Sequence, residues 1–86
     1  MSRIVNIGYG NMVNADKIIS IIKPDAAPVK RLIQNAKDSG MALDATCGRK
    51  TKSAIILENG NVILSALLPD TIATRINESA RGDINE

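Results

Sequence analysis

The chain has 86 residues, with 11 Lys or Arg, 9 Asp or Glu, one Cys, one Tyr and no His, Trp or Phe. This length accommodates one domain over residues 1–86 and excludes a second. Without His, and with a single Cys, the chain cannot assemble the usual zinc ligand sets or a Ser/His or Cys/His nucleophile pair.

The N-terminal segment shows no signal-peptide pattern, and no apolar run approaches the ~20 residues that cross a bilayer. The single Cys cannot form an internal disulfide. We therefore expect a cytoplasmic protein without membrane contact. A short chain with an aliphatic core buries limited area, so we also expect self-association.

The net charge of +2 hides an uneven distribution. Residues 1–52 carry nine basic and four acidic side chains, whereas residues 53–86 carry two basic and five acidic ones. Such asymmetry in one small domain favours an anionic partner for the basic part. The alternative is that folding intermixes the two groups.

Residues 3–10, RIVNIGYG, are predicted to form a short strand, because they are rich in β-branched side chains and end in a Gly-x-Gly turn. We expect Gly8 and Gly10 to be structural, allowing a sharp turn or a close backbone approach. A phosphate cradle is the alternative, but the third glycine of a dinucleotide fingerprint falls on Val13. Residues 11–16 are predicted to form a loop.

Residues 17–24, KIISIIKP, fit two interpretations. Ala15, Ile18, Ile19 and Ile22 have helical spacing, whereas four isoleucines within five positions are typical of a buried strand. We predict a strand that ends at Pro24.

Residues 24–40 show the clearest pattern of the chain, that of an amphipathic helix. Asp25 is predicted to cap it, Pro28 lies in its first turn and Gly40 stops it. The apolar stripe consists of Val29, Leu32, Ile33 and Ala36. The outward face carries Lys30, Arg31, Gln34, Lys37 and Asp38.

Residues 41–68 are predicted to form strands, with Asn59 and Gly60 as a two-residue hairpin turn. This turn places Leu57 opposite Val62, Ile56 opposite Ile63, Ile55 opposite Leu64 and Lys52 opposite Leu67. Both faces of the hairpin are then apolar, and both must be covered.

Residues 69–82 are predicted to form a second helix, capped by Asp70. Its apolar stripe is Ile72, Ala73, Ile76 and Ala80. The fold class is therefore α+β: a small antiparallel β-sheet of four to five strands with two α-helices, in the order β-β-α-β-β(-β)-α. Two helices on one face leave apolar area on the other, which a second subunit would cover.

The acidic residues and the cysteine give little support for catalysis. Asp16, Asp38 and Asp44 are interpreted as turn or surface residues rather than as an acid–base pair, and Cys47 as a small core residue. We therefore predict no enzyme, no metal and no cofactor.

Arg49, Lys50 and Lys52 lie close together in GRKTK, residues 48–52, with no carboxylate among them. One interpretation is a solvated strand end, and the other is a cationic rim that meets phosphates. Two or three phosphate contacts bind only at about 10⁻⁴ to 10⁻⁶ M, but repetition around an oligomer multiplies them. Tyr9 is the only aromatic residue, which favours duplex DNA over readers that stack single-stranded bases.

Several motifs resemble, in the same order and with the same spacing, the RemA-type extracellular-matrix regulatory proteins of bacteria. They are NIGYGN at 6–11, PDAAPVKRLI at 24–33, DATCGRKT at 44–51 and VILSALLP at 62–69. Any one of them alone would be weak, but together they are specific and span nearly the whole chain.

The resemblance implies a non-catalytic, DNA-binding transcriptional regulator of biofilm matrix genes. It also implies a closed homo-oligomeric ring, for which an octamer is one candidate, engaging repeated promoter sites on double-stranded DNA. By this resemblance Arg49 and Lys50 are the primary contacts, Lys17 is the second and Pro28 is structural. Lys52 and Lys30 are expected to give peripheral support.

The family pattern often has Arg where this chain has Lys17 and Lys50, and an aromatic residue in place of Cys47. Lysine is a point charge rather than a bidentate fork, so phosphate positioning is retained while base reading is weakened. Two other functions stay open: an RNA-binding protein, and a structural oligomer whose basic rim meets an acidic protein.

Overall fold

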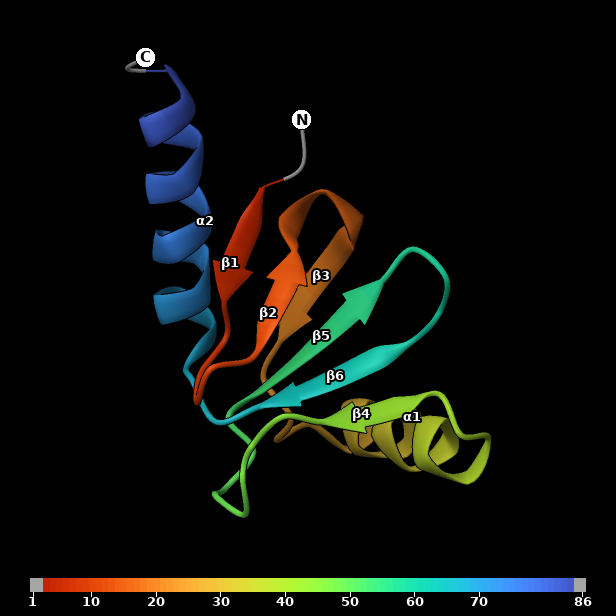
Figure 1. The fold of residues 1–86 in the computed structure, drawn as a ribbon. Helices are drawn as coiled ribbons and strands as arrows, with labels where there is room; N and C mark the ends of the chain where they lie inside the picture. Colours follow the sequence, from red (N-terminus) through yellow and green to blue (C-terminus); the bar gives the residue numbers. More distant parts are fainter. Residues whose placement is uncertain (1–2, 85–86) are drawn as a thin grey trace.

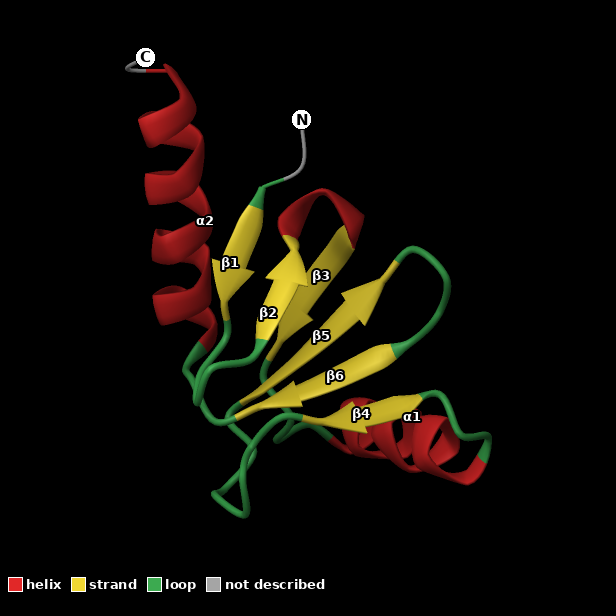
Figure 2. Cartoon of the chain, in the orientation of Figure 1, coloured by secondary structure: helices red, strands yellow, loops and turns green. Residues whose placement is uncertain are grey.

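The computed structural model describes residues 3–84, and their side chains over residues 3–78. The described residues form two α-helices and two sheets, which confirms the α+β class (Figures 1 and 2). In chain order the elements are β1 (Ile4–Asn6), β2 (Met12–Asn14), the 3₁₀ turn η1 (Ala15–Lys17), β3 (Ile18–Ile22), α1 (Ala27–Asp38), β4 (Ala42–Asp44), β5 (Ser53–Leu57), β6 (Val62–Ser65) and α2 (Pro69–Ile84).

The larger sheet has the strand order β3-β5-β6-β4, and it is mixed rather than antiparallel. β3 and β6 both pair antiparallel with β5, whereas β4 pairs parallel with β6, with Leu43 opposite Ile63. The helix α1 carries the chain from β3 at one edge to β4 at the other. Such a long connection lets the chain arrive at β6 in the parallel direction.

The prediction of a loop over residues 11–16 is wrong, because β2 pairs there with β1 in a second, two-stranded sheet. Val5 lies opposite Val13, and both are buried. A strand of three residues with one buried side chain is too short to show alternation. The strand predicted over residues 17–24 is confirmed as β3.

The hairpin of β5 and β6 has a register that differs by one residue from the predicted one. Ile55 lies opposite Ile63 and Ile56 opposite Val62. The amide of Leu57 donates to the carbonyl of Asn61 (2.9 Å), so the loop has three residues, and Gly60 has a φ of 89°. A three-residue loop with a left-handed glycine is the common alternative to the two-residue turn.

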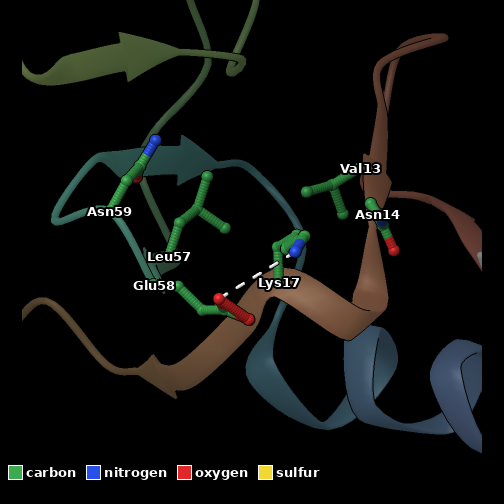
Figure 3. A pocket seen from close by; sticks show the side chains of 6 residues that line it. All are labelled: Val13, Asn14, Lys17, Leu57, Glu58 and Asn59. Atoms are coloured by element: carbon green, nitrogen blue, oxygen red, sulfur yellow. Dashed lines mark ion pairs between the residues drawn. The ribbon is translucent and has the colours of Figure 1, made fainter.

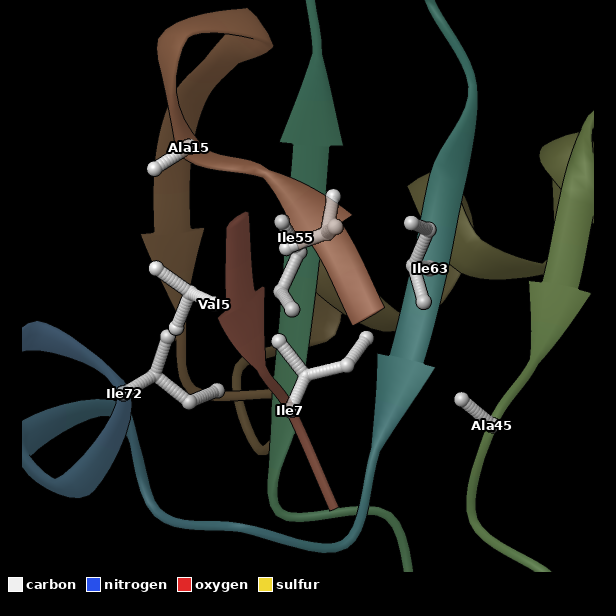
Figure 4. Close-up of a cluster of buried hydrophobic side chains, with 8 residues drawn as sticks. Val5, Ile7, Ala15, Ala45, Ile55, Ile63 and Ile72 are labelled. Atoms are coloured by element: carbon white, nitrogen blue, oxygen red, sulfur yellow. The ribbon is translucent and has the colours of Figure 1, made fainter. Parts of the chain in front are cut away.

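Both faces of this hairpin are covered within one chain. On one face Val5 of β1, Ile7 just after β1 and Ile72 of α2 pack with Ile55 and Ile63 (Figure 4). On the other face Ala36 of α1 packs with Ala54, Val62 and Leu64. The expectation that both helices share one face, leaving the other to a second subunit, is therefore wrong.

The helix ends differ in part from the predictions. Ala26, not Asp25, is the N-cap of α1 and makes no side-chain cap hydrogen bond, while Pro28 lies in the first turn as predicted. Gly40 follows the helix with a φ of 75°, a conformation that suits glycine.

In α2 the chain enters the helix at Pro69, so Asp70 lies in the first turn instead of capping it. Ile72 is buried and Ile76 is partly buried, but Ala73 is exposed, contrary to the predicted stripe. The side chain of Ala80 lies outside the described residues. Neither α1 nor the described part of α2 has the length and apolar character of a membrane span.

Candidate functional site

Two loops meet at one end of the larger sheet. The first holds Gly8, Tyr9 and Gly10, and the second joins β4 to β5 and holds Cys47 and Gly48. All five residues have positive φ, with 54° at Tyr9 and 53° at Cys47. Positive φ is uncommon for residues other than glycine, and it persists where the surroundings enforce it.

Asn11 ties the two loops together. Its amide nitrogen lies 3.0 Å from the carbonyl oxygen of Gly8 and 3.3 Å from that of Ala45. The hydroxyl of the buried Ser65 donates to the carbonyl of Ile7 (2.7 Å), which anchors the first loop to the end of β6. The loops are therefore held on the sheet by specific hydrogen bonds.

Gly8 has the structural role that the sequence predicts. A Cβ atom at this position would lie 3.2 Å from Cγ of Leu67, and its φ is 114°. Gly10 also has a positive φ, 80°, but faces open space. Glycine is therefore favoured at residue 8 by both space and conformation, and at residue 10 by conformation alone.

The second loop begins with a turn in which the carboxylate of Asp44 accepts two hydrogen bonds. Oδ1 of Asp44 accepts hydrogen bonds from the hydroxyl (2.6 Å) and the amide (2.8 Å) of Thr46. The hydroxyl bond, followed by the amide bond, lowers the pKa of Asp44, and the charge of Lys37 adds to this against a small opposing effect of burial. The amide of Arg49 then donates to the carbonyl of Thr46 (3.0 Å).

Arg49 is placed over the ring of Tyr9. Its Cζ atom lies 5.5 Å from the ring centroid, within cation–π range, and both residues are exposed. Cys47 is also exposed, so its interpretation as a core residue is wrong. The rigid loops thus present a guanidinium and an aromatic ring to solvent side by side.

Lys50 and Lys52 lie together, as expected, and the structure adds Lys23 to them. The three lysines line one shallow pocket with Asp25, Thr51, Pro24 and Leu68. Lys23 was not among the site residues predicted from the sequence, although its position in the chain gives part of the signal. It ends a predicted strand, but only the pairing of β3 with β5 shows that this end lies beside Lys52.

Lys17 lies at the opposite end of β3. Its Nζ is 4.0 Å from a carboxylate oxygen of Glu58, beside a pocket of about 380 Å³ whose lining also includes Val13 and Leu57 (Figure 3). In Figure 1 the β5–β6 turn and the β4–β5 loop lie at opposite ends of β5. Five residues of strand span about 17 Å, so Lys17 does not meet Arg49 and Lys50 within one chain.

Lys30 is exposed in the first turn of α1, outside the pocket lining. Among the described side chains the ion pairs are Arg3 with Asp16 (3.0 Å) and Lys17 with Glu58. Within that part of the chain, Lys23, Arg49, Lys50 and Lys52 therefore make no ion pair. We call these four residues the cationic rim.

The described residues contain no group of three His, Cys, Asp or Glu placed to hold a metal ion. The pocket between Lys23, Lys50 and Lys52 is lined by these three cations and by one carboxylate, that of Asp25. Its chemistry is that of anion binding.

Comparisons with known proteins agree over nearly the whole chain. The chain is 59% identical over 86 residues to a protein of Lachnoclostridium phytofermentans, covering 100% of this chain and 94% of that one. It is 48% identical over 83 residues to a protein of Carboxydothermus hydrogenoformans, covering 96% and 95%. It is 53% identical over 76 residues to a protein of Geobacillus kaustophilus, covering 88% and 87%.

The names of all three relatives begin with the words "Putative regulatory protein". The profile of a family described as "Extracellular matrix regulatory protein A-like" matches residues 4–76, which include the two loops, the cationic rim and both sheets. This chain belongs to the RemA-like family.

Proposed function

We propose that this protein is a non-catalytic, cytoplasmic transcriptional regulator that binds double-stranded DNA as a closed homo-oligomeric ring. The observation that carries the proposal is the cationic rim: four basic side chains at one end of the sheet, without an ion-pair partner among the described residues. A group of unpaired cations suits the phosphates of a duplex. The names of the relatives support a regulatory role.

Self-association is supported by the exposed apolar side chains. Ile4, Met12, Ile19, Leu43 and Leu68 are each more than half exposed. Ile19 and Leu43 lie on β3 and β4, which are the two edge strands of the larger sheet. Unpaired edges with apolar side chains are favourable sites for another chain.

A ring would strengthen the weak DNA binding that a single cationic rim provides. In a cyclic assembly the copies are equivalent, so every rim takes the same place relative to the ring axis. Each phosphate contact after the first is then intramolecular, and the affinities multiply. Lys17, at the far end of β3, would add a second row of cations. The words "Extracellular matrix regulatory protein" in the family description support a regulatory role, and we propose biofilm matrix genes as its target.

The proposal is tested by titrating a random and a genomic duplex with the purified protein at two salt concentrations and by measuring the mass of the free particle. We expect binding that weakens steeply with salt and a particle of several subunits. A monomeric particle, or a particle that does not bind duplex DNA at low salt, would refute the proposal.

One observation keeps an RNA ligand as the second candidate: Tyr9 is 53% exposed beside Arg49, an arrangement on which an unpaired base could stack. Competition between the duplex and a single-stranded RNA of the same sequence separates the two. Preferential binding of the duplex favours the DNA proposal. A ring that binds neither would favour an acidic protein as the partner of the rim.

A further inference from the structure

Three lysines from two separate segments converge on one pocket of the cationic rim. Lys23 follows β3, while Lys50 and Lys52 precede β5, and the pocket between them has a volume of about 260 Å³. This is smaller than the roughly 300–1,000 Å³ of a typical small-molecule site. The pocket suits a compact anion better than a whole nucleotide.

We propose that this pocket binds a single phosphate group, and that Lys23 is one of its three cationic contacts. The phosphate is that of a duplex backbone or of a free phosphate ligand. Its assignment to DNA rests on the function proposed above, whereas the anion site does not.

The pairing of β3 with β5 fixes this arrangement. Ile22 lies opposite Ala54, so continuation of the register places Pro24 opposite Lys52. The amide of Lys52 donates to the carbonyl of Ser65 (2.8 Å), which ties the approach to β5 to the neighbouring strand. The backbones that carry Lys23 and Lys52 are therefore held side by side before any ligand arrives.

The chemistry of the lining favours a phosphate. The three ammonium groups each offer up to three N–H donors, and Thr51 can add a hydroxyl donor. Asp25 is the one carboxylate of the lining, which leaves a formal charge of +2. Asp25 lies before the N-cap of α1, Ala26, and α1 makes no side-chain cap hydrogen bond. The negative charge of Asp25 opposes anion binding, and this carboxylate has no evident role in the fold.

The first experiment uses the full chain, isotopically labelled, titrated with inorganic phosphate at constant ionic strength and followed by the amide signals of Thr51 and Lys52. We expect saturable shifts in the wild type and their loss in Lys23→Gln. We expect Asp25→Asn to bind phosphate about two- to fivefold more tightly, because one repulsive charge is removed. This gain cannot arise from misfolding. Amide shifts that are equal in all three proteins and do not saturate with phosphate would refute the proposed site.

The second experiment measures duplex DNA affinity against salt for Lys23→Gln and for Arg31→Gln, a control that removes an exposed cation of α1 outside the pocket. Losing a phosphate contact lowers the salt slope by about 0.9 per contact. We expect this decrease only for Lys23→Gln, and equal slopes would overturn the DNA role of Lys23. Saturable phosphate binding without any duplex binding would keep the pocket and refute the proposed function.

Discussion

The guanidinium carbon of Arg49 lies 5.5 Å from the centre of the Tyr9 ring, although the two residues are 40 positions apart in the chain. Both sit on loops with left-handed backbone, and Asn11 joins those loops. The aromatic ring therefore restricts where the positive charge of Arg49 can go. The contact with Tyr9 thus favours one orientation of the Arg49 side chain.

The first prediction concerns this contact. Tyr9→Leu is expected to weaken duplex binding about two- to fivefold, because an exposed cation–π contact contributes about 0.5–1 kcal/mol. Tyr9→Phe keeps the ring and is the matched control. After Arg49→Gln the Tyr9→Leu change should have no further effect in a double-mutant cycle. Strictly additive losses would show that the ring does not act through Arg49.

The second prediction concerns Gly8. Gly8→Ala is expected to cost about 1–3 kcal/mol of unfolding free energy, because the new Cβ crowds Leu67 and the φ of 114° strains any L-residue. Gly10→Ala, with open space around it, is the control and should cost less. Urea unfolding at one fixed protein concentration measures both. Equal costs would mean that strain acts alone, without the contact to Leu67.

The third prediction concerns the pH dependence of the loop after β4. The pKa of Asp44 is lowered in the folded chain, so its carboxylate stabilises the fold above the unfolded pKa, and this is lost as the pH falls through the folded pKa. Asp44→Asn should therefore lower the free energy of unfolding at pH 7 by about 0.5 kcal/mol, because Asp44 is exposed and solvent screens its charge. The difference from the wild type should shrink as the pH falls below about 4. A difference that stays constant from pH 7 to pH 3 would contradict this role.

The fourth prediction concerns Lys17, which is paired weakly with Glu58 at 4.0 Å. If Lys17 contacts DNA, Glu58→Gln removes both its partner and a repulsive charge, and duplex affinity should rise about two- to fivefold. Glu78→Gln, an exposed glutamate of α2, is the control for net charge. An equal gain in both variants would assign the effect to overall charge rather than to Lys17.

The sequence predicted the elements with long apolar patterns and missed those that depend on partners. Helical spacing of apolar side chains predicts the helix over residues 24–40. A run of β-branched side chains predicts the strand over residues 17–24. β2 has only one buried side chain, so nothing in its own pattern distinguishes it from a loop. The hairpin register was missed because Asn59 and Gly60 also fit a loop of three residues.

The candidate site was predictable in the same uneven way. Arg49, Lys50 and Lys52 are neighbours in sequence, so their clustering was visible. Lys23 joins them only through the pairing of β3 with β5, and Tyr9 meets Arg49 only through the two loops. The resemblance placed Lys17 with the site, whereas in the structure Lys17 precedes β3 and Lys23 follows it, so the two lie at opposite ends of that strand. Long-range pairing, which a single sequence does not encode locally, decides all three positions.

The last prediction concerns the proposed self-association. Ile19 on β3 and Leu43 on β4 are 65% and 60% exposed, and they lie on the two opposite edges of one sheet. A contact between two different edges is heterologous, and a heterologous contact that closes gives a ring. Ile19→Lys and Leu43→Lys are each expected to reduce the particle mass, because a charge at an edge opposes pairing.

Light scattering of the free particle measures this effect. Leu32→Lys, at an exposed apolar position on α1 rather than on an edge strand, is the control and should leave the mass unchanged. If the edges make the ring, both edge variants also lose duplex affinity while keeping every residue of the cationic rim, because the multiplication of weak contacts is lost. An edge variant that stays assembled would place the subunit contact elsewhere. A dissociated variant with full affinity would show that one rim suffices for DNA.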